Sequence, residues 1–224
     1  MLTDAEITEI SRRAILDRDQ YSMCRLVAVL RSREPLLLDI GAHVGWWTVK
    51  FLEHCPRGRS ECYEPIAENV VRIPRDPRVT VHQVAVDVRE GALRLYRHTG
   101  TEHLGPVNNA LWSALAAFGG PHTAERVVPS VDFRDVLLAH EHVDVVKMDV
   151  EGHEGELLRR VTPRELSRID VFVLEDHAGS RVRVDRRIFA EAGMRLWYNA
   201  KGGPGHPVFA SERLGLGAQE FPPA

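Results

Sequence analysis

The chain has 224 residues, 44% of them hydrophobic, which is enough for one domain with a sizeable buried core. Its 29 basic and 32 acidic residues leave a net charge of −3, so charge gives no reason to expect a nucleic acid or an anionic membrane as a partner. The three cysteines, Cys24, Cys55 and Cys62, lack the spacing of a disulfide framework or a structural zinc site.

The N-terminal sequence MLTDAEITEISRR is charged and amphipathic, unlike a secretory signal, and no apolar run approaches the roughly 18 residues of a membrane span. We therefore expect a cytoplasmic protein, with residues 1–224 forming a single domain. Residues 4–31 follow a capping-box pattern with apolar residues at approximately helical spacing, which predicts one or two helices within an N-terminal extension, 1–34.

The core, predicted over 35–224, begins with a short apolar run, Leu36 to Ile40, bounded by Pro35 and Gly41. Such a run is typical of a strand buried on both faces of a parallel sheet. Strands and helices then alternate, which predicts βαβ units. The expected helices cover 46–54, 66–73, 132–140, 154–161 and 181–192. The expected strands cover 60–64, 79–86, 92–98, 127–131, 143–148 and 170–174, followed by MRLWYN and a Gly/Pro-rich tail that could return as a closing strand or hairpin.

Residues 99–125 are rich in Gly, Asn and Thr and predict a long loop. A loop of that length within a compact domain is usually functional or mobile, so it is a candidate substrate lid. Its polar residues Asn109 and Ser113 are candidate substrate contacts, whereas Trp112 suits either stacking on a substrate or docking of the loop.

The turn after the first strand narrows the choice of ligand. Gly41 and Gly45 enclose His43, so the turn lacks the middle glycine of the dinucleotide-binding G-x-G-x-x-G pattern, and no Gly-Lys-Ser/Thr ending indicates a P-loop. The sequence favours a ligand that needs a tight turn and close backbone approach but carries no pyrophosphate. S-adenosylmethionine fits that description, and Glu64, nineteen residues after Gly45, stands near the spacing expected for a ribose-binding carboxylate.

Five segments occur in a characteristic order: DIGAHVGWWT, CYEP, VHQVAVDVREGALRLY, VVKMDVEGHEGELL and VFVLED. Over about residues 36–177 the chain resembles the FkbM-type class I methyltransferases, and VVKMDVEGHE is the most specific of these segments. The resemblance implies an α/β, Rossmann-like class I methyltransferase fold with a mostly parallel seven-stranded sheet and helices on both faces. It also implies S-adenosylmethionine as cofactor and methyl transfer, most often to an oxygen of a sugar, a polyketide or another small natural product.

The resemblance also assigns cofactor-binding positions. Asp39, Gly41, His43 and Gly45 would hold the methionine portion, with His43 standing where an asparagine is expected, and Asp39 alternatively serving as a turn residue. Glu64 would bind the ribose, and the 83–87 turn, with Gln83, Ala85 and Asp87, would bind the adenine.

Acidic residues and a histidine crowd the end of the strand at 143–148. Class I methyltransferases place groups facing the transferred methyl here, so Asp149 is a candidate for both cofactor binding and catalysis. His153 is a candidate general base for a hydroxyl. Glu151 is a candidate catalytic residue, although the dipole of the helix that follows also favours acids at Glu151 and Glu154.

The end of the strand at 170–174 carries Glu175, Asp176 and His177. Asp149, Glu175 and Asp176 together predict an oxygen-ligand Mg²⁺ site that could orient a diol, while Glu175 and His177 are alternatively substrate contacts and Asp176 could cap a helix.

Three functions remain open on the sequence alone. The first is O-methylation of a small-molecule hydroxyl, the second is N-methylation of a peptide or amide, and the third is a catalytically inactive S-adenosylmethionine-binding module. The expected partner is a small acceptor rather than a nucleic acid or a membrane, and the sequence is compatible with a homo-oligomer.

Overall fold

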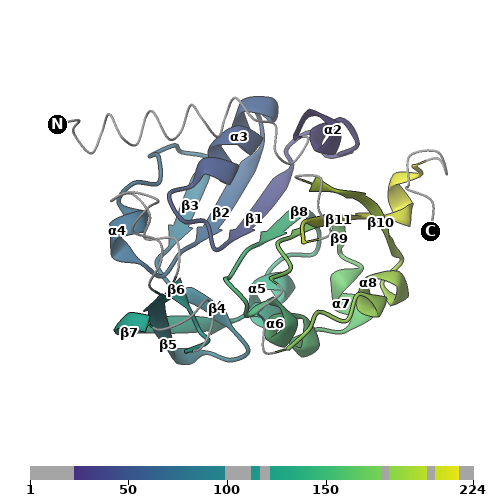
Figure 1. Ribbon diagram of the computed structural model, residues 1–224. Coiled ribbons are helices and arrows are strands. Elements are labelled where there is room, and N and C mark those ends of the chain that lie inside the picture. Colours follow the sequence, from purple (N-terminus) through teal and green to yellow (C-terminus); the bar gives the residue numbers. More distant parts are fainter. Residues whose placement is uncertain (1–22, 99–111, 117–121, 178–181, 201–204, 217–224) are drawn as a thin grey trace.

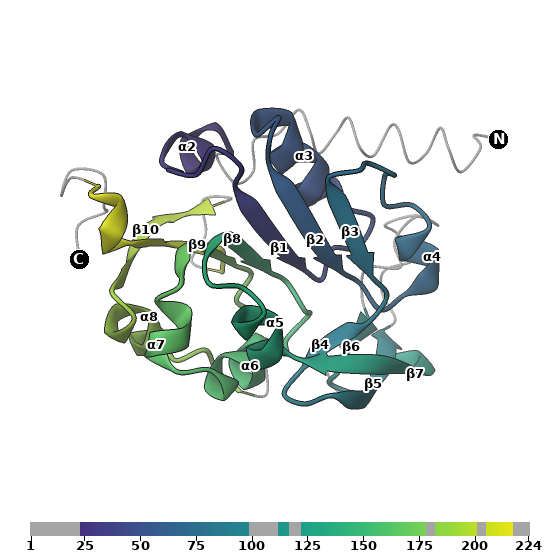
Figure 2. The same cartoon turned by 180° about the vertical axis from the view of Figure 1, so that it is seen from behind.

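The computed structural model describes residues 23–98, 112–116, 122–177, 182–200 and 205–216. A seven-stranded sheet runs through the molecule in the order β10-β11-β9-β8-β1-β2-β3 (Figures 1 and 2). Its strands are β1 (Leu36–Ile40), β2 (Arg59–Tyr63), β3 (Val79–His82), β8 (Val143–Met148), β9 (Ile169–Leu174), β10 (Met194–Asn199) and β11 (Pro207–Ser211).

The sheet is parallel except where β11 pairs antiparallel with its two neighbours, β9 and β10. Strand order reverses beside β1, since β2 and β3 lie on one side of it and β8 and β9 on the other. In an open parallel sheet, ligands bind beyond the carboxyl ends of the strands at such a point. The predicted seven-stranded, mostly parallel α/β fold is confirmed, including the closing hairpin at its edge.

Helices cover both faces of this sheet because its strands present apolar side chains on both sides. Leu36, Leu38 and Ile40 pack with the helices on one face, whereas Leu37 packs on the other. The first face carries α5 (Phe133–Leu138), α6 (Glu154–Arg160), α7 (Pro163–Leu166) and α8 (Arg187–Glu191), and the second carries α2 (Met23–Ala28) and α3 (Trp46–His54). β1 is consequently fully buried, as its sequence predicts.

A second, four-stranded sheet was not predicted. Its order is β4-β7-β5-β6, with β4 (Ala85–Asp87), β5 (Gly91–His98), β6 (Trp112–Ser113) and β7 (His122–Asp132). The single strand expected at 79–86 is therefore wrong: the chain leaves the central sheet after His82 and enters the second sheet at Ala85. Within the predicted 99–125 loop, β6 and the start of β7 are strands, and 99–111 and 117–121 lie outside the described residues.

Several helix ends also differ from the expectation. The helix expected at 66–73 is the short α4 (Ala67–Val70), and that expected at 181–192 is reduced to α8. The helix α7 was missed, although Thr162 and Glu165 form a complete capping box at its start and Pro163 occupies its first position. The 3₁₀ helix η3 (Glu212–Leu214) follows β11.

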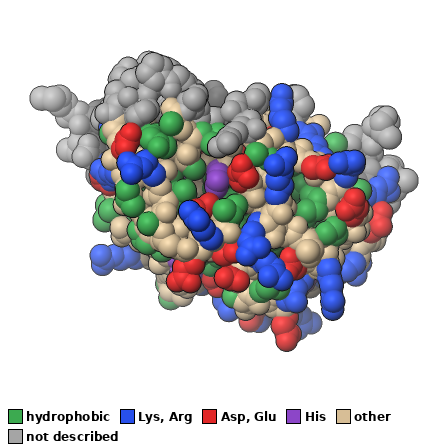
Figure 3. Space-filling model, turned by 90° about the horizontal axis from the view of Figure 1, so that it is seen from below, with side chains coloured by type: hydrophobic (Ala, Val, Ile, Leu, Met, Phe, Trp, Pro, Cys, Tyr) green, Lys and Arg blue, Asp and Glu red, His purple; other side chains and the backbone are tan. Residues whose placement is uncertain are grey.

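None of the helices in the described part of the chain is long and apolar enough to cross a bilayer. Basic and acidic side chains are intermixed on the face of the molecule drawn in Figure 3. Exposed ion pairs, such as those of Arg94 with Glu125 and of Arg126 with Glu68, also place opposite charges next to each other.

Candidate active site

The turn between β1 and α3 requires its glycines. Gly41 has a φ of +75°, and a Cβ at this position would lie 1.8 Å from the carbonyl oxygen of Asp149. Gly45, with a φ of +78°, begins α3. His43 also adopts a left-handed conformation, with a φ of +51°, which is uncommon for a residue with a side chain. The backbones after β1 and β8 thus meet at the point where strand order reverses.

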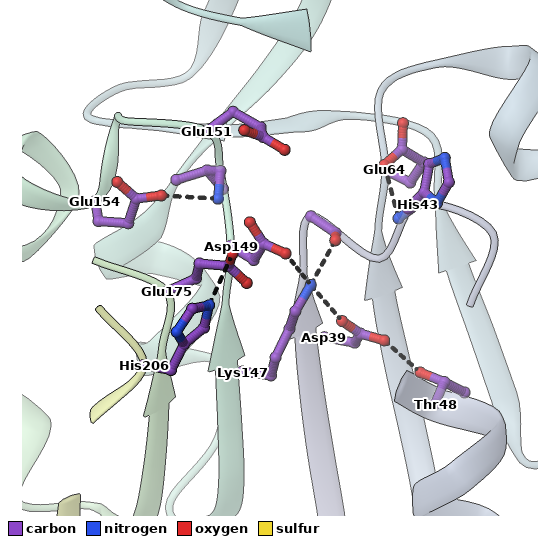
Figure 4. Close-up of polar contacts among 12 residues, drawn as sticks. Asp39, His43, Thr48, Glu64, Lys147, Asp149, Glu151, Glu154, Glu175 and His206 are labelled. Atoms are coloured by element: carbon purple, nitrogen blue, oxygen red, sulfur yellow. Dashed lines mark hydrogen bonds and ion pairs between the residues drawn. The ribbon is translucent and has the colours of Figure 1, made fainter. Parts of the chain in front are cut away.

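A buried lysine ties these two strands together. Lys147, on β8, donates a hydrogen bond from Nζ to the carbonyl oxygen of Gly41 at 2.6 Å. The same nitrogen lies 3.4 Å from Oδ1 of Asp39 and 3.5 Å from Oδ2 of Asp149 (Figure 4). Asp39 also accepts a hydrogen bond from the Thr48 hydroxyl at 2.8 Å, which anchors α3. We refer to Asp39, Lys147, Asp149 and the Gly41 carbonyl as the Lys147 centre.

Charges within this centre compensate one another. Burial alone would lower the pKa of Lys147, but the nearby carboxylates of Asp149, Asp39 and Glu175 raise it well above its ordinary value. Lys147 therefore remains a cation, since its ammonium stays paired with carboxylates in a site shielded from water. Asp39 is fully buried and does not line the pocket described below, so it holds the turn from behind instead of contacting the methionine portion as predicted.

A pocket opens in front of this turn, with an empty volume of about 770 Å³, part of it open to solvent. It is bounded by the ends of β1, β2 and β8 and by the second sheet. Among the predicted site residues, those on its wall are Gly41, His43, Glu64, Ala85, Asp149, Glu151 and His153. The apolar part of the wall includes Tyr63, Ile66, Leu93, Leu95 and Trp112.

Three polar atoms of the pocket residues are buried without a hydrogen-bond partner among the described residues. They are Nε2 of His43, Oδ1 of Asn69 and Nδ1 of His153. A buried polar group without a partner costs about 1–3 kcal/mol, so such groups need a ligand or water to complete them. Burial also lowers the pKa of His43 to about 4, so its ring is neutral and can accept or donate a hydrogen bond.

Glu64, which was predicted to bind the ribose, follows β2 directly and lines the pocket. Its Oε1 accepts hydrogen bonds from the backbone of Ile66 and from Asn69, and its Oε2 accepts one from the backbone of His43 at 2.9 Å. A carboxylate has about four acceptor sites, so one remains on Oε2 for a hydroxyl in the pocket. Burial raises the pKa of Glu64 to about 7 despite these hydrogen bonds.

His153 and Asp87 form a pair on the side of the pocket next to the second sheet. Nε2 of His153 lies 2.8 Å from Oδ1 of Asp87. Burial works against the charge of Asp87, but the hydrogen bond from His153 prevails and lowers its pKa. The pairing places the proton on Nε2 and leaves Nδ1 as a base. Asp87, predicted to bind adenine, does not line the pocket and orients His153 instead.

An acidic cluster surrounds His177 at the end of β9. His177 Nδ1 lies 2.9 Å from Glu154, and its Nε2 lies 3.4 Å from Glu151, 3.9 Å from Glu175 and 4.0 Å from Asp149. Although burial opposes its charge, these carboxylates raise the pKa of His177 to about 9, so it is a cation at neutral pH.

Two acids of this cluster, Asp149 and Glu151, have raised pKa values. Burial and the charges of its acidic neighbours raise the pKa of Glu151 to about 8, and burial also raises the pKa of Asp149. Glu151 has a φ of +53°, a strained conformation of the kind that collects at functional sites. Glu154 caps the preceding turn through hydrogen bonds from the backbone of Val150 and Gly152, so its expected structural role is confirmed.

Two members of the predicted metal set, Glu175 and Asp176, are not among the ligand atoms that converge with Asp149. The Asp176 carboxylate instead lies 2.8 Å from Arg186. The potential ligand atoms that do converge belong to Asp149, Glu151 and His177. Between these acids, the cationic His177 provides the charge compensation that a metal ion would supply.

Several other predicted site residues do not line the pocket. Ser113 is fully buried, donates a hydrogen bond to the Glu151 carbonyl at 2.6 Å and accepts one from Leu115, so it fixes β6 instead of facing a substrate. Gln83 is exposed and, like Gly45, does not line the pocket. Glu175 lies 3.0 Å from His206 beside the pocket. Asn109 lies outside the described residues.

No role for Lys147 was predicted from the sequence, although the sequence contains a signal for one. It is one of three lysines in the chain, and it interrupts the apolar run VDVVKM of a central strand. A lone cation in such a strand must have buried acidic partners. Leu93 and Leu95 of β5 were also missed, because nothing local indicates that a second sheet folds over the carboxyl ends of the central strands.

A family model described as the methyltransferase FkbM domain matches residues 39–199. The chain belongs to the FkbM methyltransferase family. The match includes the Gly41 turn, the Lys147 centre and the His153–Asp87 pair, so the family resemblance seen in the sequence is confirmed.

Two relatives illustrate this similarity. The chain is 25% identical over 149 residues to the 2-O-methyltransferase NoeI of Sinorhizobium fredii, an alignment that covers 60% of each chain. The structure of methyltransferase FkbM from Methylobacillus flagellatus KT superposes with a TM-score of 0.51 at 12% identity, over 80% of this chain and 44% of that one. The chain therefore spans less than two thirds of the length of each of these proteins, and the second comparison supports the fold alone.

Proposed function

We propose that this protein is an S-adenosylmethionine-dependent O-methyltransferase that acts on a hydroxyl of a small molecule, a sugar or a polyketide-type natural product. The observation that carries the proposal is a single pocket that joins the Gly41–His43 turn, the Glu64 carboxylate and the Asp149–His153 segment. The pocket therefore brings the turn expected to hold the cofactor and a candidate base next to each other.

The residues of the pocket fit S-adenosylmethionine. The one acceptor site left on Glu64 suits a ribose hydroxyl, and the unpartnered Oδ1 of Asn69 provides a further acceptor beside it. The apolar wall formed by Ile66, Leu93 and Leu95 suits a planar base. Asp149, at the centre of the site, provides negative charge for the amino group or sulfonium. When bound, this cofactor would supply an electrophilic methyl group that needs no further activation.

The chain's own contribution to the chemistry is alignment of an acceptor and removal of its proton. His153 is held by Asp87, and its Nδ1 has no partner among the described residues, which suits it to take a proton from a hydroxyl in the pocket. Glu151 stands on the same wall, and its raised pKa makes it the second candidate.

An oxygen acceptor is favoured over an amide nitrogen by two considerations. An alcohol can be methylated once a single base removes its proton, and the pocket offers an oriented histidine for that step. The similarity to a protein named as a 2-O-methyltransferase points the same way.

The test is transfer of a labelled methyl group from S-adenosylmethionine to a panel of glycosides, polyketide alcohols and short peptides. We expect labelled product with at least one hydroxyl-bearing acceptor and none with the peptides. Transfer to peptides alone would replace the proposal with N-methylation, and a folded protein that binds the cofactor but methylates no acceptor would favour an inactive binding module.

A further inference from the structure

A second group of potential metal ligands lies at the opposite end of the central sheet. His142 precedes β8, Asp144 is the second residue of β8, and Asp170 is the second residue of β9. The pairing of Val143 with Ile169 and of Val145 with Val171 places the two aspartates side by side on parallel strands. They lie at the amino ends of these strands, about 17 Å along β8 from Asp149, so they are separate from the methyltransferase pocket.

The two carboxylates are buried, with exposures of 4% for Asp144 and 6% for Asp170. Each has one oxygen engaged by the protein. Oδ2 of Asp144 accepts a hydrogen bond from the backbone of Leu36 at 2.8 Å, and Oδ1 of Asp170 accepts one from Arg213 at 3.1 Å. These contacts fix the carboxylates so that their other oxygens are directed toward the His142 ring.

The remaining oxygens and the ring nitrogen form a compact set. Nε2 of His142 lies 3.2 Å from Oδ2 of Asp170 and 3.8 Å from Oδ1 of Asp144. The ligand atoms of all three residues lie within 4.8 Å of one another. Bonds of about 2.0–2.2 Å to a tetrahedral Zn²⁺ place its ligands about 3.3–3.5 Å apart, so both distances to His142 are close to this spacing.

One atom of this set is buried without a partner. Oδ1 of Asp144 is inaccessible to solvent and has no hydrogen-bond partner among the described residues, although it points toward His142. Burial raises the pKa of this carboxyl, and the neighbouring Asp170 charge adds to that effect. A cation between the two aspartates would complete the coordination of this oxygen and relieve their repulsion.

We propose that His142, Asp144 and Asp170 bind a divalent transition-metal ion of the Zn²⁺ class at the amino end of the sheet. One imidazole and two carboxylates suit such an ion, and the Leu36 amide and Arg213 act as the outer hydrogen bonds that orient metal-binding carboxylates. The His142 side chain is 45% exposed, which provides a path for the ion and for water as a fourth ligand.

The experiment is titration of the full chain with Zn²⁺ against a chromogenic chelator, which reports stoichiometry and affinity. We expect His142→Ala to lose one Zn²⁺ equivalent, or to bind that equivalent at least about tenfold more weakly, and Asp170→Asn to do the same. His54→Ala is the matched control, because it removes an imidazole that contacts the Lys50 carbonyl outside the cluster.

Unchanged stoichiometry and affinity in both His142→Ala and Asp170→Asn would overturn the proposal. Loss of the equivalent in His177→Ala alone would likewise overturn it by assigning the ion to the pocket. Far-ultraviolet circular dichroism should show that His142→Ala is folded, since this side chain is partly exposed, and binding of S-adenosylhomocysteine by the variants should equal that of the wild-type chain.

Discussion

The Lys147 centre and the His153–Asp87 pair lie at the same end of the sheet but differ in how their charges are satisfied. In the centre, one buried ammonium serves two carboxylates and a carbonyl, and Asp39 is fully enclosed. In the pair, one histidine nitrogen is bound to Asp87 and the other has no partner in the part of the chain that the structure describes. On this difference we propose that the first group maintains the geometry of the site, whereas the second takes part in proton transfer.

The largest effect is expected from His153→Gln. Glutamine can still donate a hydrogen bond to Asp87, but it cannot accept a proton, so kcat for methyl transfer should fall by about 10²–10⁴-fold. The unfolding temperature should change by only a few degrees. A kcat within threefold of the wild-type value would remove His153 as the base and direct attention to Glu151.

For Lys147→Met, the comparison predicts a large loss of stability, in contrast to the loss of kcat expected for His153→Gln. Removal of the ammonium leaves Asp39 buried without a counter-charge, which should cost about 3–5 kcal/mol in the free energy of unfolding. Urea denaturation measures this loss, with Lys50→Met as a control, because the pair of Lys50 with Glu53, at 3.6 Å, is partly exposed. Addition of Asp39→Asn to Lys147→Met should recover part of the loss, and equal stability of the Lys147→Met and wild-type chains would contradict the role of the centre.

His177 lies in the acidic cluster beside Asp149, and its charge should be visible in the pH dependence of stability. Its pKa rises from the ordinary value of 6.5 to about 9 in the folded protein, so the folded chain binds this proton more tightly than the unfolded chain. The resulting stabilisation is complete below about pH 6.5 and is lost as pH rises through 9, a change on the order of 3 kcal/mol.

Urea denaturation at several pH values between 6 and 9.5 tests this expectation. The free energy of unfolding should decline over the range in the wild-type chain, and His177→Gln should make the decline clearly shallower. An identical slope in the two proteins would show that His177 is not the proton-binding group.

The smallest effect is expected from Ser113→Ala. The buried hydroxyl links β6 to the Glu151 carbonyl, so its loss should reduce the free energy of unfolding by about 1–2 kcal/mol without changing the KM for the acceptor. Ser167→Ala, which removes an exposed hydroxyl bonded to the Arg164 carbonyl, should have little effect on stability. A raised KM in Ser113→Ala would restore this residue as a substrate contact.

The central sheet could be predicted from the sequence because its signals are local. The runs at Leu36–Ile40 and Val143–Met148 are apolar and bounded by turn residues, and the structure places strands over these same residues. The second sheet could not be predicted, because the change of sheet between His82 and Ala85 depends on β7, whose Ser130 pairs with Ala85 from 45 residues further along the chain.

The site residues likewise divide into those that the sequence predicts and those whose partners only the fold reveals. Gly41, Glu64 and Asp149 follow directly from their positions at strand ends, and the structure places them in one pocket. The pairing of Asp87 with His153, and of Asp176 with Arg186, joins residues whose spacing in the sequence carries no signal. Residue types therefore indicated the chemistry of the site, while the assignment of partners required the fold.

Titration calorimetry with S-adenosylhomocysteine tests the central claim most directly. We predict one binding site per folded chain, with affinity reduced at least about tenfold in Glu64→Gln, because the amide offers fewer acceptor sites to the ribose. Glu68→Gln is the control, since Glu68 pairs with Arg126 on the surface. Binding that is absent at millimolar ligand in a folded sample would contradict the account, and equal affinity in Glu64→Gln would contradict the placement of the ribose.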